Sequence, residues 1–173
     1  TEYGDYKAAL KFTNNTPYAA PSVPVTMSVL PRGALQANLS PQGAVDDGAQ
    51  WRRTGTDAWF ETGHTESDLF VGDYTVEFKS LTGWNTPPNQ DVTVTSGMTT
   101  VISATYERTT YTLTYLAGPN GSVDGATTQT VVHGDDGTTV TAMPDTGYHF
   151  VRWSDDVPNA ARQDTNVTTD ITV

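Results

Sequence analysis

Residues 73–79 read Asp-Tyr-Thr-Val-Glu-Phe-Lys, and this stretch carries the period that decides the fold. Tyr74, Val76 and Phe78 alternate with polar residues. Because successive side chains of a strand point to opposite faces, the alternation predicts a half-buried β-strand. Turn sequences of the Asn-Gly and Asp-Gly type separate such runs, so the sequence predicts an all-β protein. The same period recurs at three further places, 92–94, 102–106 and 111–115.

The composition excludes several functional classes. The chain has 173 residues, of which 20 are acidic and 9 basic, and a formal net charge of −11. Its only lysines are Lys7, Lys11 and Lys79, so the sequence offers no basic patch for nucleic acid. The absence of cysteine excludes disulfides, thiolate catalysis and cysteine-ligated metal sites.

The sequence gives no sign of membrane insertion. No apolar run reaches the roughly 18 residues of a membrane-spanning helix. No signal-like stretch follows Thr1. We therefore expect a soluble chain that is either a processed mature protein or an excerpt of a longer one.

The alternating runs and turns divide the chain into three segments. Residues 1–32 hold two alternating runs joined by a proline-containing connector. Residues 33–108 and 109–173 each predict a small β module, with almost no linker between them. We expect two small tandem modules of β-sandwich or β-grasp-like architecture, preceded by an N-terminal extended strand segment that could act between molecules.

The segment 34–106 contains a set of motifs in a fixed order. They are a Pro-x-Gly-Ala start at Pro41, Trp51-Arg52, Gly72-x-Tyr74, Gly83-Trp84 and two closing strands of valine and threonine. In this arrangement the segment resembles the PEGA-like β modules that recur in bacterial surface and secreted proteins. The resemblance implies an extracellular β module.

A second set of motifs fills residues 111–173. It comprises a Leu-Thr strand, an Asn-Gly-Ser-Val hairpin, a Thr-Val-Thr-Ala strand and the run Gly147-Tyr148-x-Phe150-x-x-Trp153-Ser154. This pattern resembles the divergent internalin B-type repeat of the Listeria–Bacteroides class. Family members usually occur on extracellular, multi-module chains, which implies a role as a stalk, an adhesin segment or a polymerising surface protein.

Two features suggest an intermolecular role for the ends. In the repeat family the closing strand normally continues beyond a stretch such as 167–173, so a sheet edge near Ile171 is expected to stay open. Residues 5–13 could complete a sheet in a neighbouring copy and generate a filament. Alternatively, they form an extra edge strand of their own chain. The alternating run without an obvious partner in either module is Tyr6, Ala8, Leu10 and Phe12.

Tryptophan side chains are the candidates for binding a glycan by ring stacking. Trp51 and Trp153 lie at motif positions within alternating runs, which favours packing in the core. Trp59 is next to Phe60, so one of these two rings is expected to be exposed. Trp59 and Trp84 are therefore the candidate glycan platform, although a structural role for both is the competing interpretation.

Acidic pairs and histidines provide no assembled catalytic or metal site. Adjacent aspartates on one turn are a poor match to the facing acid and base of a glycosidase. No calcium-binding loop of the Asp-x-Asp-x-Asp-Gly type occurs, and we keep a calcium site open without naming ligands. No Gly-x-Ser-x-Gly elbow or phosphate-binding loop is present. The residues considered are Asp46-Asp47, Asp135-Asp136, Asp155-Asp156, His64, His133 and His149.

These observations predict a structural protein and not an enzyme. We expect a non-catalytic extracellular protein of a bacterial surface, either a stalk or adhesin segment or a filament subunit assembled by strand addition. Its expected partners are other copies or neighbouring modules, with glycans as a further option, and we expect no cofactor. The alternative is a carbohydrate-binding module of a larger secreted protein, which a glycan array distinguishes.

Overall fold

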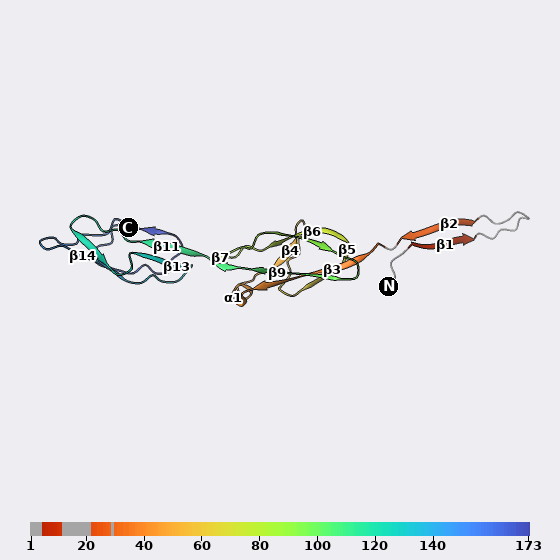
Figure 1. Cartoon of the computed structure of the whole chain (residues 1–173), viewed down its shortest axis with the longest axis horizontal. Coiled ribbons are helices and arrows are strands. Elements are labelled where there is room, and N and C mark those ends of the chain that lie inside the picture. The colour runs from red at the N-terminus through yellow and green to blue at the C-terminus, as the bar shows by residue number, and fades with distance from the viewer. Residues whose placement is uncertain (1–4, 12–21, 29) are drawn as a thin grey trace, which may run out of the picture. The chain divides into compact units, whose positions relative to one another are not determined.

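The computed structural model describes residues 5–11, 22–28 and 30–173 (Figure 1). Within these ranges the single helix is α1 (Gln42–Asp46), and the other elements are strands. The all-β prediction is therefore confirmed. The helix occupies the stretch before Gly48, where the sequence pattern predicted only a turn, and Gly48 follows it with a φ of +93°.

The chain divides into two compact units. The second comprises Ser80–Pro87 and Thr105–Val173, and the first holds the other described residues up to Ala104. The chain thus passes from one unit to the other three times. This division assigns Ser80–Pro87 to the second unit, although the sequence pattern placed it in the segment 33–108.

The N-terminal segment forms a hairpin of its own. Strand β1 (Asp5–Lys11) pairs antiparallel with β2 (Ser22–Ser28), in a register that places Asp5 opposite Ser28 and Ala9 opposite Pro24. Proline is tolerated here because both strands of a two-stranded sheet are edge strands. The run that had no obvious partner in either module thus has one in its own segment. Phe12 lies outside the described residues.

The first unit contains two three-stranded sheets. Their strand orders are β5–β3–β9 and β4–β6–β8. Strand β6 pairs antiparallel with both β4 and β8. The strands are β3 (Arg32–Ser40), β4 (Trp51–Arg53), β5 (Thr65–Phe70), β6 (Gly72–Phe78), β8 (Gln90–Val94) and β9 (Thr99–Thr105).

The alternation in residues 73–79 sets the two faces of β6. Val76 and Phe78 are buried and Tyr74 is half-buried. On the polar face, Thr75 donates a hydrogen bond of 2.6 Å to Asp91 of the neighbouring strand. The predicted strand period is therefore confirmed. The buried apolar side chains of this unit are Leu35, Ala37, Leu39, Ala44, Ala49, Trp51, Leu69, Val76, Phe78, Val92, Val94 and Ala104.

The second unit also contains two three-stranded sheets, together with a short strand pair. The sheet orders are β13–β11–β16 and β12–β14–β15, and β7 pairs with β10. Strand β16 runs parallel to β11, whereas the other pairs are antiparallel. The strands are β7 (Trp84–Asn85), β10 (Glu107–Arg108), β11 (Thr110–Thr114), β12 (Gly121–Asp124), β13 (Thr128–Val132), β14 (Val140–Pro144), β15 (Ala161–Arg162) and β16 (Ile171–Thr172).

One buried cluster forms the core of the second unit. Trp153 packs edge-on against Tyr115, with 6.0 Å between ring centroids, and its indole nitrogen donates to the carbonyl of Asn159 at 2.9 Å. Burying a large ring and satisfying its one polar atom removes the cost of an unpaired donor. The cluster consists of Leu113, Tyr115, Val131, Val140, Trp153 and Val167.

Gly83 is a position where a side chain does not fit. Its φ is +76°, and a Cβ there would lie 2.8 Å from Cδ2 of His133. We expect Gly83→Ala to lower the free energy of unfolding by more than about 1 kcal/mol, because left-handed strain and the clash add together. Urea denaturation followed by circular dichroism measures the loss.

Gly147 provides the control in the same unit. Its φ is +90°, but a Cβ there would meet no atom within 4 Å beyond its chain neighbours, so Gly147→Ala introduces the strain without the clash. We expect a loss of only about 1 kcal/mol. Equal losses for the two variants would show that the ring of His133 moves aside freely.

Candidate functional site

A groove of about 520 Å³ lies on the second unit. Trp153 and Phe150 contribute aromatic surface to its lining, and Leu116, Met143 and Val151 line it with exposed apolar side chains. Polar and charged side chains, among them Asn120, Ser122 and Arg152, line the same groove, so its lining is mixed.

The charges of the groove are neutralised within it. Arg152 and Asp156 form an ion pair of 3.0 Å in which both side chains are largely exposed. His149 also lines the groove and is exposed. Exposed ion pairs of this kind contribute little to stability.

Trp51 and Trp153, which the sequence placed in the core, are both buried. Trp51 is fully buried and donates through Nε1 to the carbonyl of Glu61 at 3.1 Å. Trp153 is buried in the core of the second unit. The predicted burial of both rings is confirmed. Trp51 lies in strand β4 as expected, but Trp153 lies outside the strands, between β14 and β15, so the strand expected around it does not form.

The two candidate glycan platforms differ in exposure. Trp84 is only 8% exposed, and the guanidinium of Arg108 lies 4.8 Å from its ring centroid. Trp59 is half-buried, with Arg52 lying 4.3 Å from its ring centroid. Stacking on a sugar needs an open ring face, so these surroundings favour a structural role for Trp84. Glycan binding at Trp59 stays a prediction.

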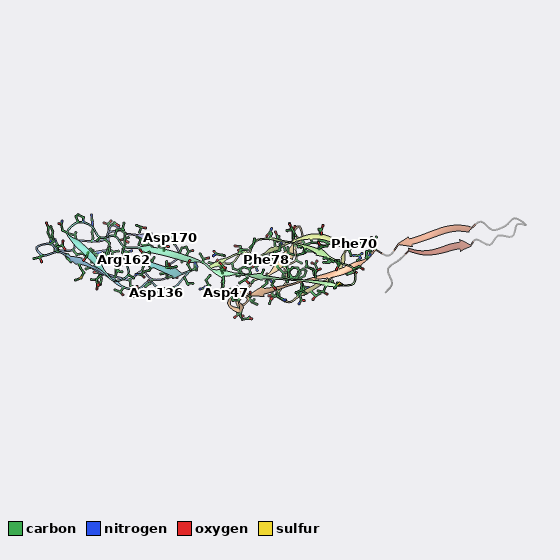
Figure 2. All side chains as sticks on the ribbon, viewed as in Figure 1. Asp47, Phe70, Phe78, Asp136, Arg162 and Asp170 are labelled. Atoms are coloured by element: carbon green, nitrogen blue, oxygen red, sulfur yellow. The ribbon has the colours of Figure 1, made fainter. Side chains whose placement is uncertain are left out.

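A buried arginine organises a network of charged and polar groups in the second unit. Arg162 donates to both carboxylate oxygens of Asp164, at 2.9 Å from Nε and 2.7 Å from Nη2. It also donates from Nη1 to Asp155 at 2.7 Å. The Tyr115 hydroxyl donates to Asp164 at 2.7 Å. Arg162 lies among the side chains of the second unit (Figure 2), so this network satisfies its charge inside the protein.

The network shifts the pKa values of its members. The hydrogen bond from Arg162 lowers the pKa of Asp164, and the hydrogen bond from Tyr115 adds to the effect. The hydrogen bond to Asp164 raises the pKa of Arg162. Burial, followed by the hydrogen bond to Asp164, raises the pKa of Tyr115. Each shift favours the pairing that the structure shows, so the network is a fixed structural element at neutral pH.

The pKa of a second buried tyrosine hydroxyl, that of Tyr106, is raised as well. Burial raises the pKa of Tyr106 to about 12. The phenol therefore stays protonated in the folded protein well above neutral pH.

The first unit uses its arginines in a similar way. Arg53 donates to both carboxylate oxygens of Glu66, at 2.7 and 2.6 Å, and so links β4 to β5. This hydrogen bonding raises the pKa of Arg53. Arg52 donates to Glu77 at 2.6 Å on the neighbouring strand. Bidentate pairing fixes the geometry between elements more tightly than a single contact does.

The candidate acids are engaged separately and do not converge. Asp155 and Asp156 bind two different arginines, and Asp136 accepts from the backbone N–H of Asn166 at 2.8 Å. Across the described part of the chain, no group of three or more histidine or acidic side chains gathers around one point. The calcium site stays a prediction without ligands.

The Arg162 network is the part of this unit that the sequence reasoning missed. Tyr115 and Asp164 are 49 residues apart, and no motif connects them. A local signal was available, since Arg162 and Asp164 are two residues apart, and an extended chain places such side chains on one face. The third member, Tyr115, depends on how the strands pack.

The features of the described residues are those of a structural β protein. The described residues fill apolar cores and pair charges within small β units. Family comparison then agrees: residues 111–173 match the family model of the divergent InlB B-repeat domain. The resemblance stated for these residues is thus confirmed, and it indicates a repeat module of the bacterial surface type, extracellular and structural or adhesin-like. The resemblance of residues 34–106 to PEGA-like modules stays a prediction.

A solved structure titled "The Bacillus anthracis TIE protein" matches with 12% identity and a TM-score of 0.48, covering 100% of this chain and 43% of that chain. The present chain therefore spans less than half the length of that one. No curated protein matches the sequence. Within the described residues, no helix has the length and apolarity needed to cross a membrane.

Proposed function

We propose that this protein is a non-catalytic structural segment of a bacterial cell surface, serving as a stalk or adhesin segment. The observation that carries the proposal is the match of residues 111–173 to a family of surface repeat domains. Its side chains support this role. The rings of Trp51 and Trp153 fill cores, and the buried guanidinium of Arg162 is held by two aspartates.

Surface labelling tests the proposal. Antibodies raised against the whole chain are expected to label intact cells that produce the protein, with no increase after permeabilisation. An antibody against a cytoplasmic protein is the matched control and should label permeabilised cells alone. Labelling of this chain only after permeabilisation would overturn the proposal.

We further propose that the ends of the chain can mediate assembly by strand addition. The edge strands β1 and β16 support this, because each has a described partner on one side only, β2 and β11 respectively. A strand with a free side is a template for pairing with another chain. The residues concerned are Tyr6, Ala8, Leu10 and Phe12 at one end and Ile171 at the other.

Electron microscopy of the intact chain and of a variant lacking residues 1–14 tests assembly. Regular fibres of the intact chain that disappear in the variant, with circular dichroism unchanged in the remaining units, are the expected result. Monodisperse monomers of the intact chain, shown by their mass in solution, would overturn assembly by strand addition. That outcome leaves the proposed role as a stalk or adhesin segment intact.

A further inference from the structure

In the β13–β11–β16 sheet, the strand that comes first in the sequence, β11, lies next to the strand that comes last, β16. Strand β11 pairs in parallel with β16, with Leu113 opposite Ile171 and Thr114 opposite Thr172. Strand β11 is the middle strand of its sheet, because β13 pairs with its other edge. The two strands run in the same direction, so pulling one by its start and the other by its end makes them slide past each other.

Hydrogen bonds span the full length of this pair. At one end, the N–H of Thr112 donates to a carboxylate oxygen of Asp170 at 2.8 Å. At the other end, the N–H of Val173 donates to the carbonyl of Thr114 at 3.0 Å, and the N–H of Leu116 donates to the carbonyl of Val173 at 2.7 Å. In a parallel pair these bonds are evenly spaced. Sliding of the strands therefore loads them together.

Side chains add a second resistance to sliding. Leu113 is fully buried in the core cluster, and Ile171 and Val173 pack against the same cluster. A shift of one residue would turn the apolar side chains of β16 away from the core, because the side-chain period of a strand is two. The pair is thus held by the hydrogen bonds along its edge, one of them to the Asp170 side chain, and by the core on one face.

The segment before β16 is bound as well. The N–H of Gly134 donates to the carbonyl of Val167 at 2.8 Å, and the N–H of Val167 donates to the carbonyl of Asp135 at 2.9 Å. The N–H of Gly137 donates to the carbonyl of Asp164 at 2.8 Å. These bonds connect the approach to β16 with the loop that follows β13.

We propose that the β11–β16 pair is a mechanical clamp, which makes the second unit resistant to tension applied along the chain. This inference rests on the proposed function as a stalk or adhesin segment, where tension is the load to be resisted. Tension between Thr110 and Val173 shears all bonds of the pair at once. Tension between Thr110 and Val132 acts differently, because these residues lie opposite each other at the same end of the antiparallel β11–β13 pair and the bonds then break one after another.

Single-molecule force spectroscopy on the full chain tests the clamp. The chain has no cysteine, so handles can be attached specifically through Thr110→Cys combined with either a cysteine appended after Val173 or Val132→Cys. We expect a severalfold higher unfolding force in the first geometry than in the second. Denaturation with urea shows that both proteins are folded and equally stable.

Asp170 provides a variant with a conservative rescue. We expect Asp170→Ala to lower the unfolding force in the Thr110–Val173 geometry and to leave it unchanged in the Thr110–Val132 geometry. Asp170→Asn keeps an acceptor oxygen for the N–H of Thr112 and should restore most of the force. Thr172→Ala is the control, because the side chain of Thr172 is exposed on the same strand.

The outcomes separate the clamp from the proposed function. Equal unfolding forces in the two pulling geometries would overturn the clamp, whatever the surface labelling shows. Labelling of permeabilised cells alone would overturn the surface role, and the measured anisotropy of the unfolding force would still establish the clamp. A force difference that Asp170→Ala reduces and Asp170→Asn restores would support the clamp directly.

Discussion

Replacing Trp153 with alanine is expected to unfold the second unit or to leave it barely stable. The side chain is buried against Tyr115 and Phe150, with ring centroids 6.0 and 5.6 Å from its own. Truncating a buried tryptophan costs about 3–5 kcal/mol, since the transfer free energy is lost and a cavity remains. Small domains have about 5–15 kcal/mol of total stability, and a unit of this size lies near the lower end.

Urea denaturation followed by far-ultraviolet circular dichroism measures this loss, because the signal does not depend on the removed fluorophore. Tyr148→Ala is the control in the same unit, since that ring is 58% exposed and its loss should change the free energy of unfolding by less than about 0.5 kcal/mol. If the Trp153→Ala and Tyr148→Ala variants were equally stable, the Trp153 ring would not be the centre of the core.

The strands were predictable from the sequence because their period is local. Tyr111, Leu113 and Tyr115 alternate with threonine, and the structure buries Leu113 and Tyr115. A half-buried strand needs only this alternation to place its faces. The turns were predictable for a related reason, since residues such as Asn120 adopt positive φ at low cost, here +67°.

The pairing of strands far apart in the sequence was not predictable in the same way. The parallel contact of β16 with β11 joins Leu113 to Ile171, and alternation says nothing about which strands become neighbours. The assignment of Ser80–Pro87 to the second unit likewise depends on β7 pairing with β10. Both follow from tertiary packing, and the pattern of apolar and polar residues along one strand carries no information about it.

At the candidate sites, too, the local features were predictable from the sequence and the long-range contacts were not. Burial of Trp51 and Trp153 followed from their motif positions, whereas the burial of Trp84 did not, because its surroundings include Arg108 from a distant strand. The network around Arg162 joins β15 to Tyr115, just beyond the end of β11. Such networks depend on long-range geometry, so a list of charged residues cannot reveal them.

Replacing Arg162 with methionine is expected to destabilise the second unit by about 3–5 kcal/mol, because Asp164 would keep a buried charge without its partner. The side chain of Arg162 is 6% exposed and that of Asp164 is 14% exposed. Methionine is similar in length to the aliphatic part of the arginine side chain, so the loss in the free energy of unfolding comes mainly from removal of the charge. Urea denaturation at neutral pH measures it.

Arg152→Met is the matched control. Arg152 pairs with Asp156, and the side chains are 63% and 77% exposed, so water already solvates both charges. We expect a loss of about 0–1 kcal/mol. Combining Arg162→Met with Asp164→Asn removes the unpaired charge while keeping an acceptor for Tyr115, and it should recover part of the stability. Equal losses for Arg152→Met and Arg162→Met would contradict the buried network.

The pH dependence provides an independent measurement of the same interaction. The pKa of Asp164 is lowered in the folded protein, so its contribution to stability is present above the ordinary aspartate pKa and is lost as the pH falls through the lowered one. In Arg162→Met the main cause of that shift is gone, and burial then favours the protonated carboxyl. The stability difference between the two proteins should therefore narrow below about pH 4. A difference that stays constant on acidification would mean that Arg162 stabilises the unit through the packing of its stem and not through its charge.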